Sequence, residues 1–179
     1  MAALKFGIAV RDITPRYPVW AHGYGARTKK SAGVREPLSL RCLAVDDGST
    51  RVLIFALDMI GVRADVCREV YDLVEAEVGV GYPNIMISGS HTHFASGIHG
   101  TPFSDPEIAM TDRDEAYTDD VKRKFVETAR EALANAREMQ LETTRIQVPQ
   151  VVYNRRTVRK SDGMVQMNLT YPEDPTPYT

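Results

Sequence analysis

The chain has 179 residues, of which 43% are hydrophobic and 26% are charged, and its formal net charge is −2. A chain of this length buries enough apolar surface on folding to form a core without disulfide or metal staples. The balanced charge gives no basic surface for nucleic acid or for an anionic membrane.

The N-terminus and the cysteines bear on where the protein resides. The chain enters a strand-like run at Leu4 without a signal peptide, and it holds no apolar stretch of about 18 residues or more. Cys42 and Cys67 are isolated in apolar contexts, which favours buried free thiols over a single disulfide. We therefore expect a cytoplasmic protein without stable membrane insertion.

The first part of the chain predicts three strands and one long loop. Residues 4–10 are typical of a strand, and Pro15 ends its pairing. Residues 15–37 are rich in Gly, Pro, Tyr, Lys and Arg, and a loop of this length is usually functional or disordered. Strands at 38–45 and 51–57 flank an Asp-Gly step, which is a signal for a β-hairpin.

The next segment predicts a βαβ unit. Residues 64–78 predict a helix that ends at Gly79, and a short buried strand follows at residues 84–88. With the strand at 51–57, this order gives two parallel strands joined by a helix, a connection that is almost always right-handed. The apolar residues of the helix recur at helical spacing, at Val66, Val70, Leu73 and Val74.

The last part predicts a second helix over residues 119–139, with Thr118 or Asp119 as its N-cap. A strand at 145–153 and a turn at 161–163 follow. The expected fold class is therefore α/β, a mixed β-sheet with a βαβ unit and flanking helices. We expect a single domain over residues 1–179 whose loop-like, proline-rich tail continues in the native protein.

Three of the four histidines lie within nine residues, directly after the strand at 84–88. His91 and His93 are two residues apart, and on an extended segment both imidazoles would point the same way. Neutral imidazole is a common zinc ligand, so a His-x-His pair at the C-terminal edge of a strand favours a metal or catalytic site over a structural role. His99 and His22 lie in loops, where we expect them to be solvated.

Asp58 is expected to lie near this pair. It follows the strand at 51–57, and ligands of open α/β folds bind where the C-terminal ends of parallel strands meet. A carboxylate beside a histidine commonly fixes the tautomer of a metal ligand. The alternative is that Asp58 only caps the following segment.

Two other segments are weaker candidates. Gly23-Tyr24-Gly25 lacks the strand-to-helix context of a phosphate-binding loop. A basic cluster lies beside the turn at 161–163, and a solvated hairpin tip is the favoured interpretation for Arg156, Arg159 and Lys160.

Several motifs together resemble a known family. They are Asp12-Ile13-Thr14-Pro15, Gly23-Tyr24-Gly25, Leu57-Asp58, Ser88-Gly89-Ser90-His91-Thr92-His93, which is the most specific, and Asn154-Arg155. The chain resembles, from about residue 6 to 165, the N-terminal portion of neutral/alkaline (non-lysosomal) ceramidases and their bacterial relatives.

The resemblance implies a zinc-dependent amidohydrolase that cleaves the amide of an N-acylsphingosine. It implies one zinc ion held by two histidines, a glutamate and a tyrosine, with one position left for water. His91 matches the first of these ligands, and His93 matches a histidine at the active centre. Arg155 is expected to face the polar head of the substrate, and we add Asp58 to His93 and Arg155 as expected catalytic residues.

The remaining zinc ligands and a functional serine come, in the family, after the position of residue 179. This chain is then the N-terminal part of a longer ceramidase-like catalytic domain, or its site is completed by partners, or it is inactive; we favour the first. Phe94-Ala95-Ser96-Gly97 also replaces the Ser-Gly-Pro-Gly type of run. We expect an N-acyl amide or lipid-like substrate, no nucleic-acid partner, and a homo-oligomer as an open possibility.

Two alternatives stand beside the ceramidase hypothesis. Another His-x-His metallohydrolase is disfavoured, because the β-lactamase type expects Asp-His where Ser96-Gly97 stands and the barrel type places its pair after the first strand. The other is a non-catalytic α/β module that binds a ligand without turnover.

Overall fold

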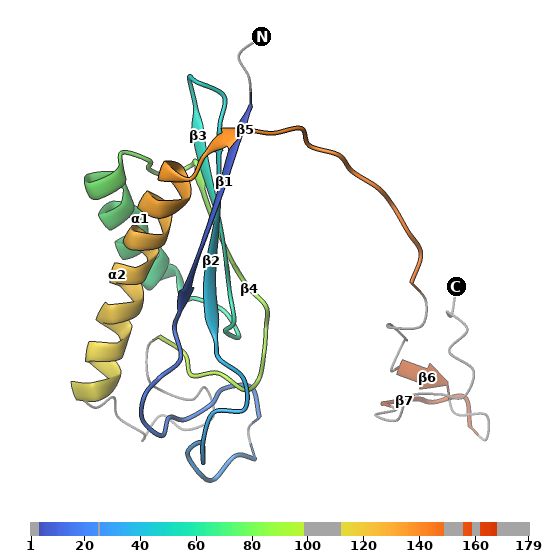
Figure 1. Ribbon diagram of the computed structural model, residues 1–179. Coiled ribbons are helices and arrows are strands. Elements are labelled where there is room, and N and C mark those ends of the chain that lie inside the picture. The colour runs from blue at the N-terminus through green and yellow to red at the C-terminus, as the bar shows by residue number, and fades with distance from the viewer. Residues whose placement is uncertain (1–3, 25, 99–111, 149–155, 159–161, 168–179) are drawn as a thin grey trace. The chain divides into compact units, whose positions relative to one another are not determined.

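The structure is a computed structural model, which describes residues 4–24, 26–98, 112–148, 156–158 and 162–167. The chain divides into two compact units, Met1–Gln140 and Leu141–Thr179. The first unit holds a five-stranded sheet and two helices (Figure 1), and the second holds a two-stranded sheet. A single domain over the whole chain stays a prediction.

The large sheet has the strand order β4-β3-β2-β1-β5. β1 (Lys5–Asp12), β2 (Ser39–Asp46) and β3 (Arg51–Leu57) pair antiparallel in succession, and the predicted hairpin at β2 and β3 is confirmed. β4 (Ile85–Gly89) pairs with β3 in parallel, whereas β5 (Arg137–Glu138) pairs antiparallel with β1. The sheet is therefore mixed, and a mixed α/β fold is confirmed.

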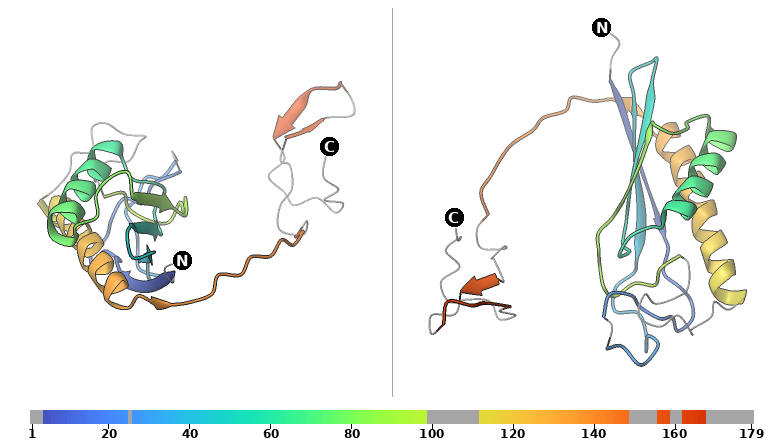
Figure 2. Two further views of the ribbon diagram at one scale, coloured as in Figure 1. Left: turned by 90° about the horizontal axis from the view of Figure 1, so that it is seen from above. Right: turned by 180° about the vertical axis from the view of Figure 1, so that it is seen from behind.

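Both helices cover the same face of this sheet (Figure 2). α1 (Ala64–Val78), which lies between β3 and β4 in the chain, has the predicted bounds. It ends at Gly79, whose φ of 75° is left-handed and whose N–H donates to the carbonyl of Glu75. α2 (Asp112–Ala134) follows β4.

No helix in the described part of the chain is long and apolar enough to cross a membrane.

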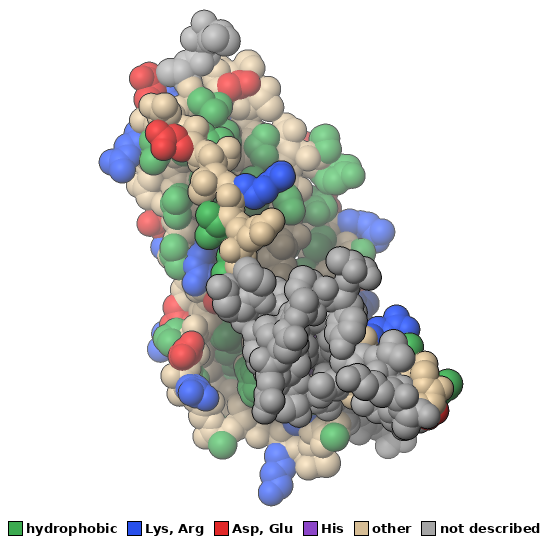
Figure 3. Space-filling model, turned by 90° about the vertical axis from the view of Figure 1, so that its right-hand side faces the viewer, with side chains coloured by type: hydrophobic (Ala, Val, Ile, Leu, Met, Phe, Trp, Pro, Cys, Tyr) green, Lys and Arg blue, Asp and Glu red, His purple; other side chains and the backbone are tan. Residues whose placement is uncertain are grey.

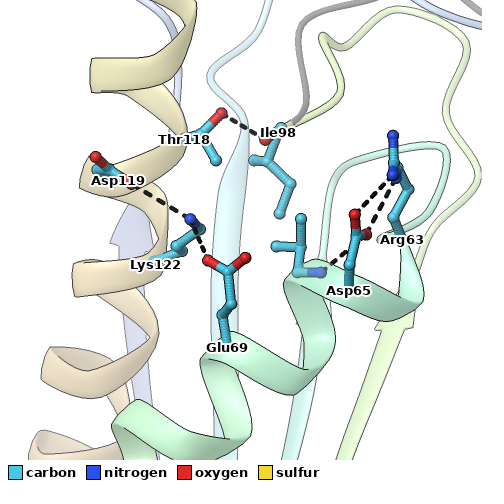
Figure 4. A network of polar contacts seen from close by, with 8 residues as sticks. Arg63, Asp65, Glu69, Ile98, Thr118, Asp119 and Lys122 are labelled. Carbon is cyan, nitrogen blue, oxygen red and sulfur yellow. Dashed lines mark hydrogen bonds and ion pairs between the residues drawn. The ribbon is translucent and has the colours of Figure 1, made fainter.

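The prediction of a second helix over residues 119–139 is wrong at both ends. Thr118 and Asp119 lie inside α2 rather than at its N-cap, and the hydroxyl of Thr118 donates to the carbonyl of Ile98 (Figure 4). Tyr117 is buried and donates to the carbonyl of Ile13 at 2.7 Å. Packing against distant segments therefore extends the helix toward its N-terminus, while pairing of β5 with β1 ends it early.

The core lies between the helices and the sheet. The rings of Phe55 on β3 and Phe125 on α2 meet edge to face, with centroids 4.9 Å apart. α2 also approaches the backbone of β1 closely, since a Cβ placed on Gly7 would lie 1.9 Å from the carbonyl oxygen of Ala132. Only glycine fits at this crossing. Val66, Val70 and Val74 of α1 and Val121, Val126 and Ala129 of α2 complete the contact.

Ion pairs join the solvent sides of the two helices. Lys122 of α2 contacts Glu69 of α1 at 2.5 Å and Asp119 at 3.3 Å (Figure 4). About two turns further along α1, Glu77 accepts from Arg123 and Arg130 of α2. Exposed pairs of this kind contribute little individually, so the apolar core supplies most of the helix-to-helix stability.

The cysteines and the second unit complete the description. Cys42 is buried on β2 and Cys67 lies on α1, and both are free thiols, as predicted.

Residues 141–148 are exposed and belong to no strand. The predicted strand at 145–153 is therefore wrong for residues 145–148, and residues 149–153 lie outside the described residues. An extended segment without a pairing partner does not form a strand. In the second unit, β6 (Arg156–Val158) and β7 (Val165–Met167) pair antiparallel.

Replacing Gly7 with alanine is expected to lower the free energy of unfolding by about 1–3 kcal/mol, because the added methyl group overlaps the backbone of α2. Gly33→Ala is the matched control, since a Cβ there meets no atom within 4 Å. Urea unfolding followed by circular dichroism measures both variants. Equal effects of the two substitutions would show that the close contact between Gly7 and α2 does not contribute to the free energy of unfolding.

Candidate active site

The two histidines lie just beyond the end of β4. The N–H of Ser90 donates to the carbonyl of Leu57, and the N–H of His91 donates to the carbonyl of Met59, both at 2.9 Å. The segment that leaves β4 is thus held against the segment that leaves β3. His91 itself has a φ of 62°, so the chain turns here and does not continue as an extended strand.

The ring of His91 is oriented by the backbone. Its Nδ1 lies 2.7 Å from the carbonyl oxygen of Ile60, and because that oxygen only accepts, Nδ1 carries the hydrogen. In the neutral ring, Nε2 then keeps its lone pair, and the side chain is exposed. Many metal-binding histidines have their ring fixed by a backbone carbonyl in this way.

His93 lies beside it. The two ring centroids are 5.2 Å apart with an angle of 67° between the ring planes, and His93 is half-buried. The structure therefore brings the two predicted imidazoles together. It does so through a left-handed turn at His91, however, and the extended geometry assumed from the sequence is wrong at that residue.

A loop from the N-terminal part of the chain packs on His93. The ring of Tyr24 contacts the imidazole edge to face at a centroid distance of 4.9 Å. Gly23 has a φ of 101°, and a Cβ there would lie 2.3 Å from Cγ of His93. The N–H of His22 donates to the carbonyl of Ala95 at 3.0 Å. A side chain at position 23 would therefore displace the ring of His93.

Arg27 ties the same loop to the histidine segment. Its Nη2 donates to the carbonyl oxygen of His93 at 3.0 Å. Its guanidinium carbon lies 5.5 Å from the ring centroid of Tyr24 and 5.8 Å from that of Phe94. Sequence reasoning missed Arg27 and Tyr24, and the glycine-rich run at 23–25 was the signal that could have pointed to them.

His22 is not solvated, so that expectation is wrong. Only 1% of its surface is exposed, and this burial lowers the pKa of its imidazole. His22 is therefore neutral in the folded protein at pH 7.

Asp58 bonds to β2 rather than to a histidine ring. Its Oδ2 accepts from the N–H of Ser39 at 3.0 Å and from the hydroxyl of Ser39 at 2.6 Å, and Arg41 lies 3.5 Å away. Partial burial opposes ionisation, but the bonds from Ser39 and the charge of Arg41 outweigh it and hold the pKa of Asp58 below its usual value. Asp58 is therefore a fixed carboxylate.

A cleft of about 980 Å³ runs past this carboxylate. Asp58 and Arg41 line it from the strand ends, and Thr92 and Phe94 line it from the histidine segment. Apolar side chains of the loop at residues 14–38 form much of the remaining wall, among them Pro15, Tyr17, Pro18, Val19, Val34 and Leu38. The cleft combines fixed charges with an apolar wall.

Two predicted residues are not placed. Arg155 and His99 lie outside the described residues, as do Arg159 and Lys160 of the basic cluster, whereas Arg156 is exposed. Within the described ranges, no group of three histidine, cysteine, aspartate or glutamate side chains could hold a metal ion. His91 and His93 are thus two candidate donors without a third.

Gly23→Ala is expected to shift the ring of His93, because the new methyl group overlaps it. Gly79→Ala is the matched control: its φ of 75° imposes the same left-handed conformation, but a Cβ there meets no atom. Imidazole resonances in ¹H–¹⁵N NMR spectra report ring position. We expect both variants to lose stability and only Gly23→Ala to move the His93 signals; unmoved signals would contradict the contact.

Asp58→Asn is expected to lower the free energy of unfolding by about 1 kcal/mol at pH 7, since the amide keeps an acceptor but loses the charge. The folded pKa is below the unfolded one, so the carboxylate stabilises the fold above its unfolded pKa, and this contribution is lost as pH falls through the folded pKa. The difference between wild type and Asp58→Asn should therefore shrink in urea titrations toward pH 3. Ser39→Ala should weaken the same dependence of stability on pH, because it removes the hydroxyl bond to Asp58. A stability difference between wild type and Asp58→Asn that does not change with pH would contradict the lowered pKa of Asp58.

Solved structures show the same fold. Neutral ceramidase from Pseudomonas aeruginosa superposes with a TM-score of 0.62 and 18% identity, over 77% of this chain and 22% of that chain. A structure described as ceramidase complexed with C2 superposes with a TM-score of 0.61 and the same identity and coverage. This chain therefore spans about a fifth of the length of these proteins. At this identity the similarity establishes the fold alone.

Sequence comparison identifies the family. No curated protein sequence matches the chain. The family profile described as neutral/alkaline non-lysosomal ceramidase, N-terminal, matches residues 4–161. The match covers most of the chain, which therefore belongs to the neutral/alkaline non-lysosomal ceramidase family.

Proposed function

We propose that this chain is the N-terminal part of a zinc-dependent amidohydrolase that hydrolyses the N-acyl amide of ceramide-like lipids to a sphingoid base and a fatty acid. The observation that carries the proposal is the exposed imidazole of His91. Its Nδ1 is bonded to Ile60, its Nε2 keeps a lone pair, and the ring of His93 lies beside it. The family match supports this class of reaction.

The described residues fit part of a zinc site. A catalytic zinc site usually has about three protein donors and one open position, and His91 supplies one donor of the right type and orientation. The other protein donors, which the described residues do not supply, are expected from elsewhere in the polypeptide, since the chain covers 22% of the matched neutral ceramidase. When bound, zinc lowers the pKa of its water toward 7 and polarises a carbonyl.

The other side chains have separate roles in this proposal. Hydrolysis adds the oxygen of water to the amide carbon, breaks the C–N bond and leaves a proton on the departing amine. His93, half-buried beside His91, is the group we assign to proton transfer. Asp58 and Arg41 fix polar groups of the substrate at the cleft, and Arg155 is proposed to face the polar head.

The cleft suits an amphipathic substrate. Its apolar wall can contact a hydrocarbon chain, while Asp58, Arg41 and Thr92 offer charge and hydrogen bonds to a hydroxylated head. A nucleic acid would instead require a broad basic surface, which the net charge of −2 does not favour.

His91→Gln and His93→Gln are expected to separate metal binding from proton transfer. In the full-length product, His91→Gln should lose zinc, as measured by atomic emission, together with hydrolysis of a fluorescent N-acyl amide. His93→Gln should keep zinc and lose roughly 10²–10⁴-fold in kcat, the usual contribution of a positioned acid or base. Full zinc content and activity in His91→Gln would overturn the proposal.

A further inference from the structure

The face of the sheet opposite the helices is apolar. Alternation along β1 turns Gly7 and Ala9 toward α2, where both are buried, and turns Ile8 and Val10 the other way, where they are 61% and 50% exposed. Figure 3 views this side, and hydrophobic side chains gather on the part of it that is visible.

Strand register aligns these side chains in rows. Ile8 pairs with Leu43, Leu43 with Ile54, and Ile54 with Met86, so one row of four aliphatic residues crosses β1, β2, β3 and β4. A second row holds Phe6, Val45 and Val52. We call these seven residues and Val10 the open sheet face.

An apolar surface of this kind is unusual on the side of a sheet that faces water. An antiparallel sheet with one solvated side normally alternates apolar and polar residues, whereas these strands are apolar on both sides. The central members of the rows are half-buried, and Met86 at the end is 57% exposed. A contiguous exposed apolar surface of this kind marks an interface.

The open sheet face ends at the candidate active site. The next row holds Val10, Arg41, Ala56 and Ser88, and Asp12 pairs with Ser39 beyond it. Arg41 and Asp58 line the cleft, and His91 follows β4 by two residues. Any layer that covers the open sheet face therefore borders the cleft.

The length of the matched proteins indicates what covers it. This chain accounts for 22% of neutral ceramidase from Pseudomonas aeruginosa, so roughly four-fifths of that polypeptide lies outside the match. We propose that the open sheet face is the docking surface for the part of a ceramidase polypeptide that follows this region in sequence.

Oxidation of Met86 by dilute hydrogen peroxide, followed by mass spectrometry, tests the docking directly. Met86 is exposed in the 179-residue chain, whereas Met59 is fully buried and serves as the protected internal control. Since sulfoxide formation follows exposure, Met86 should oxidise roughly tenfold more slowly in the full-length product than in the 179-residue chain. Equal rates in the two proteins would overturn the proposal.

A substitution gives a second measurement. Ile8→Lys should leave the urea midpoint of the 179-residue chain unchanged, because the side chain is already exposed, and should lower that of the full-length product. Tyr82→Lys is the matched control, because Tyr82 is 72% exposed but packs near Tyr71 of α1, and we expect it to affect both proteins equally. Equal effects of Ile8→Lys on both proteins would count against docking.

The outcomes separate the two proposals. Protection of Met86 in a full-length product that binds no zinc would support the docking and refute the zinc site. Zinc bound through His91 with Met86 still exposed would support the function and refute the docking. Protection in the 179-residue chain that disappears on dilution would assign the open sheet face to a second copy and overturn the proposal.

Discussion

The parallel pairing of β3 with β4 is the constraint on which the candidate site depends. Leu57 and Gly89 are paired at the ends of these strands, so the two segments that follow leave the sheet side by side. Three bonds then join them: Ser90 to Leu57, His91 to Met59, and the imidazole of His91 to Ile60. Two segments that are far apart in the chain are thus held side by side. The parallel pairing of β3 with β4 requires a crossover connection, which α1 provides.

The sequence predicts the elements whose signals are local. The apolar spacing of α1 and the glycine after it are contained within the helix and its cap, and the predicted bounds match those observed. The Asp-Gly turn between β2 and β3 is equally local. The start of α2 depends instead on Thr118 and Tyr117 reaching Ile98 and Ile13, contacts between residues that the sequence does not show to be neighbours.

The same distinction explains the candidate site. Topology alone places Asp58 and the histidines at one edge of the sheet, and that much follows from the order of strands and helix. The direction of the Asp58 carboxylate is decided by Ser39 on the adjacent strand, and the ring of His91 is fixed by a backbone carbonyl instead of by that carboxylate. The loop carrying Tyr24 and Arg27 has no periodic pattern, so its packing on His93 could not be predicted.

The left-handed backbone of His91 bears on why an imidazole is present there. A side chain at a φ of 62° costs of order 1–3 kcal/mol relative to glycine, which occupies this region freely. Two hydrogen bonds from His91, one from its N–H and one from its ring, compensate part of that cost. Glycine would keep the N–H bond and remove the strain, so backbone geometry alone favours glycine. The backbone therefore does not account for a histidine at this position, whereas the proposed role as a zinc ligand does, because Nδ1 is bonded to Ile60 and Nε2 keeps its lone pair.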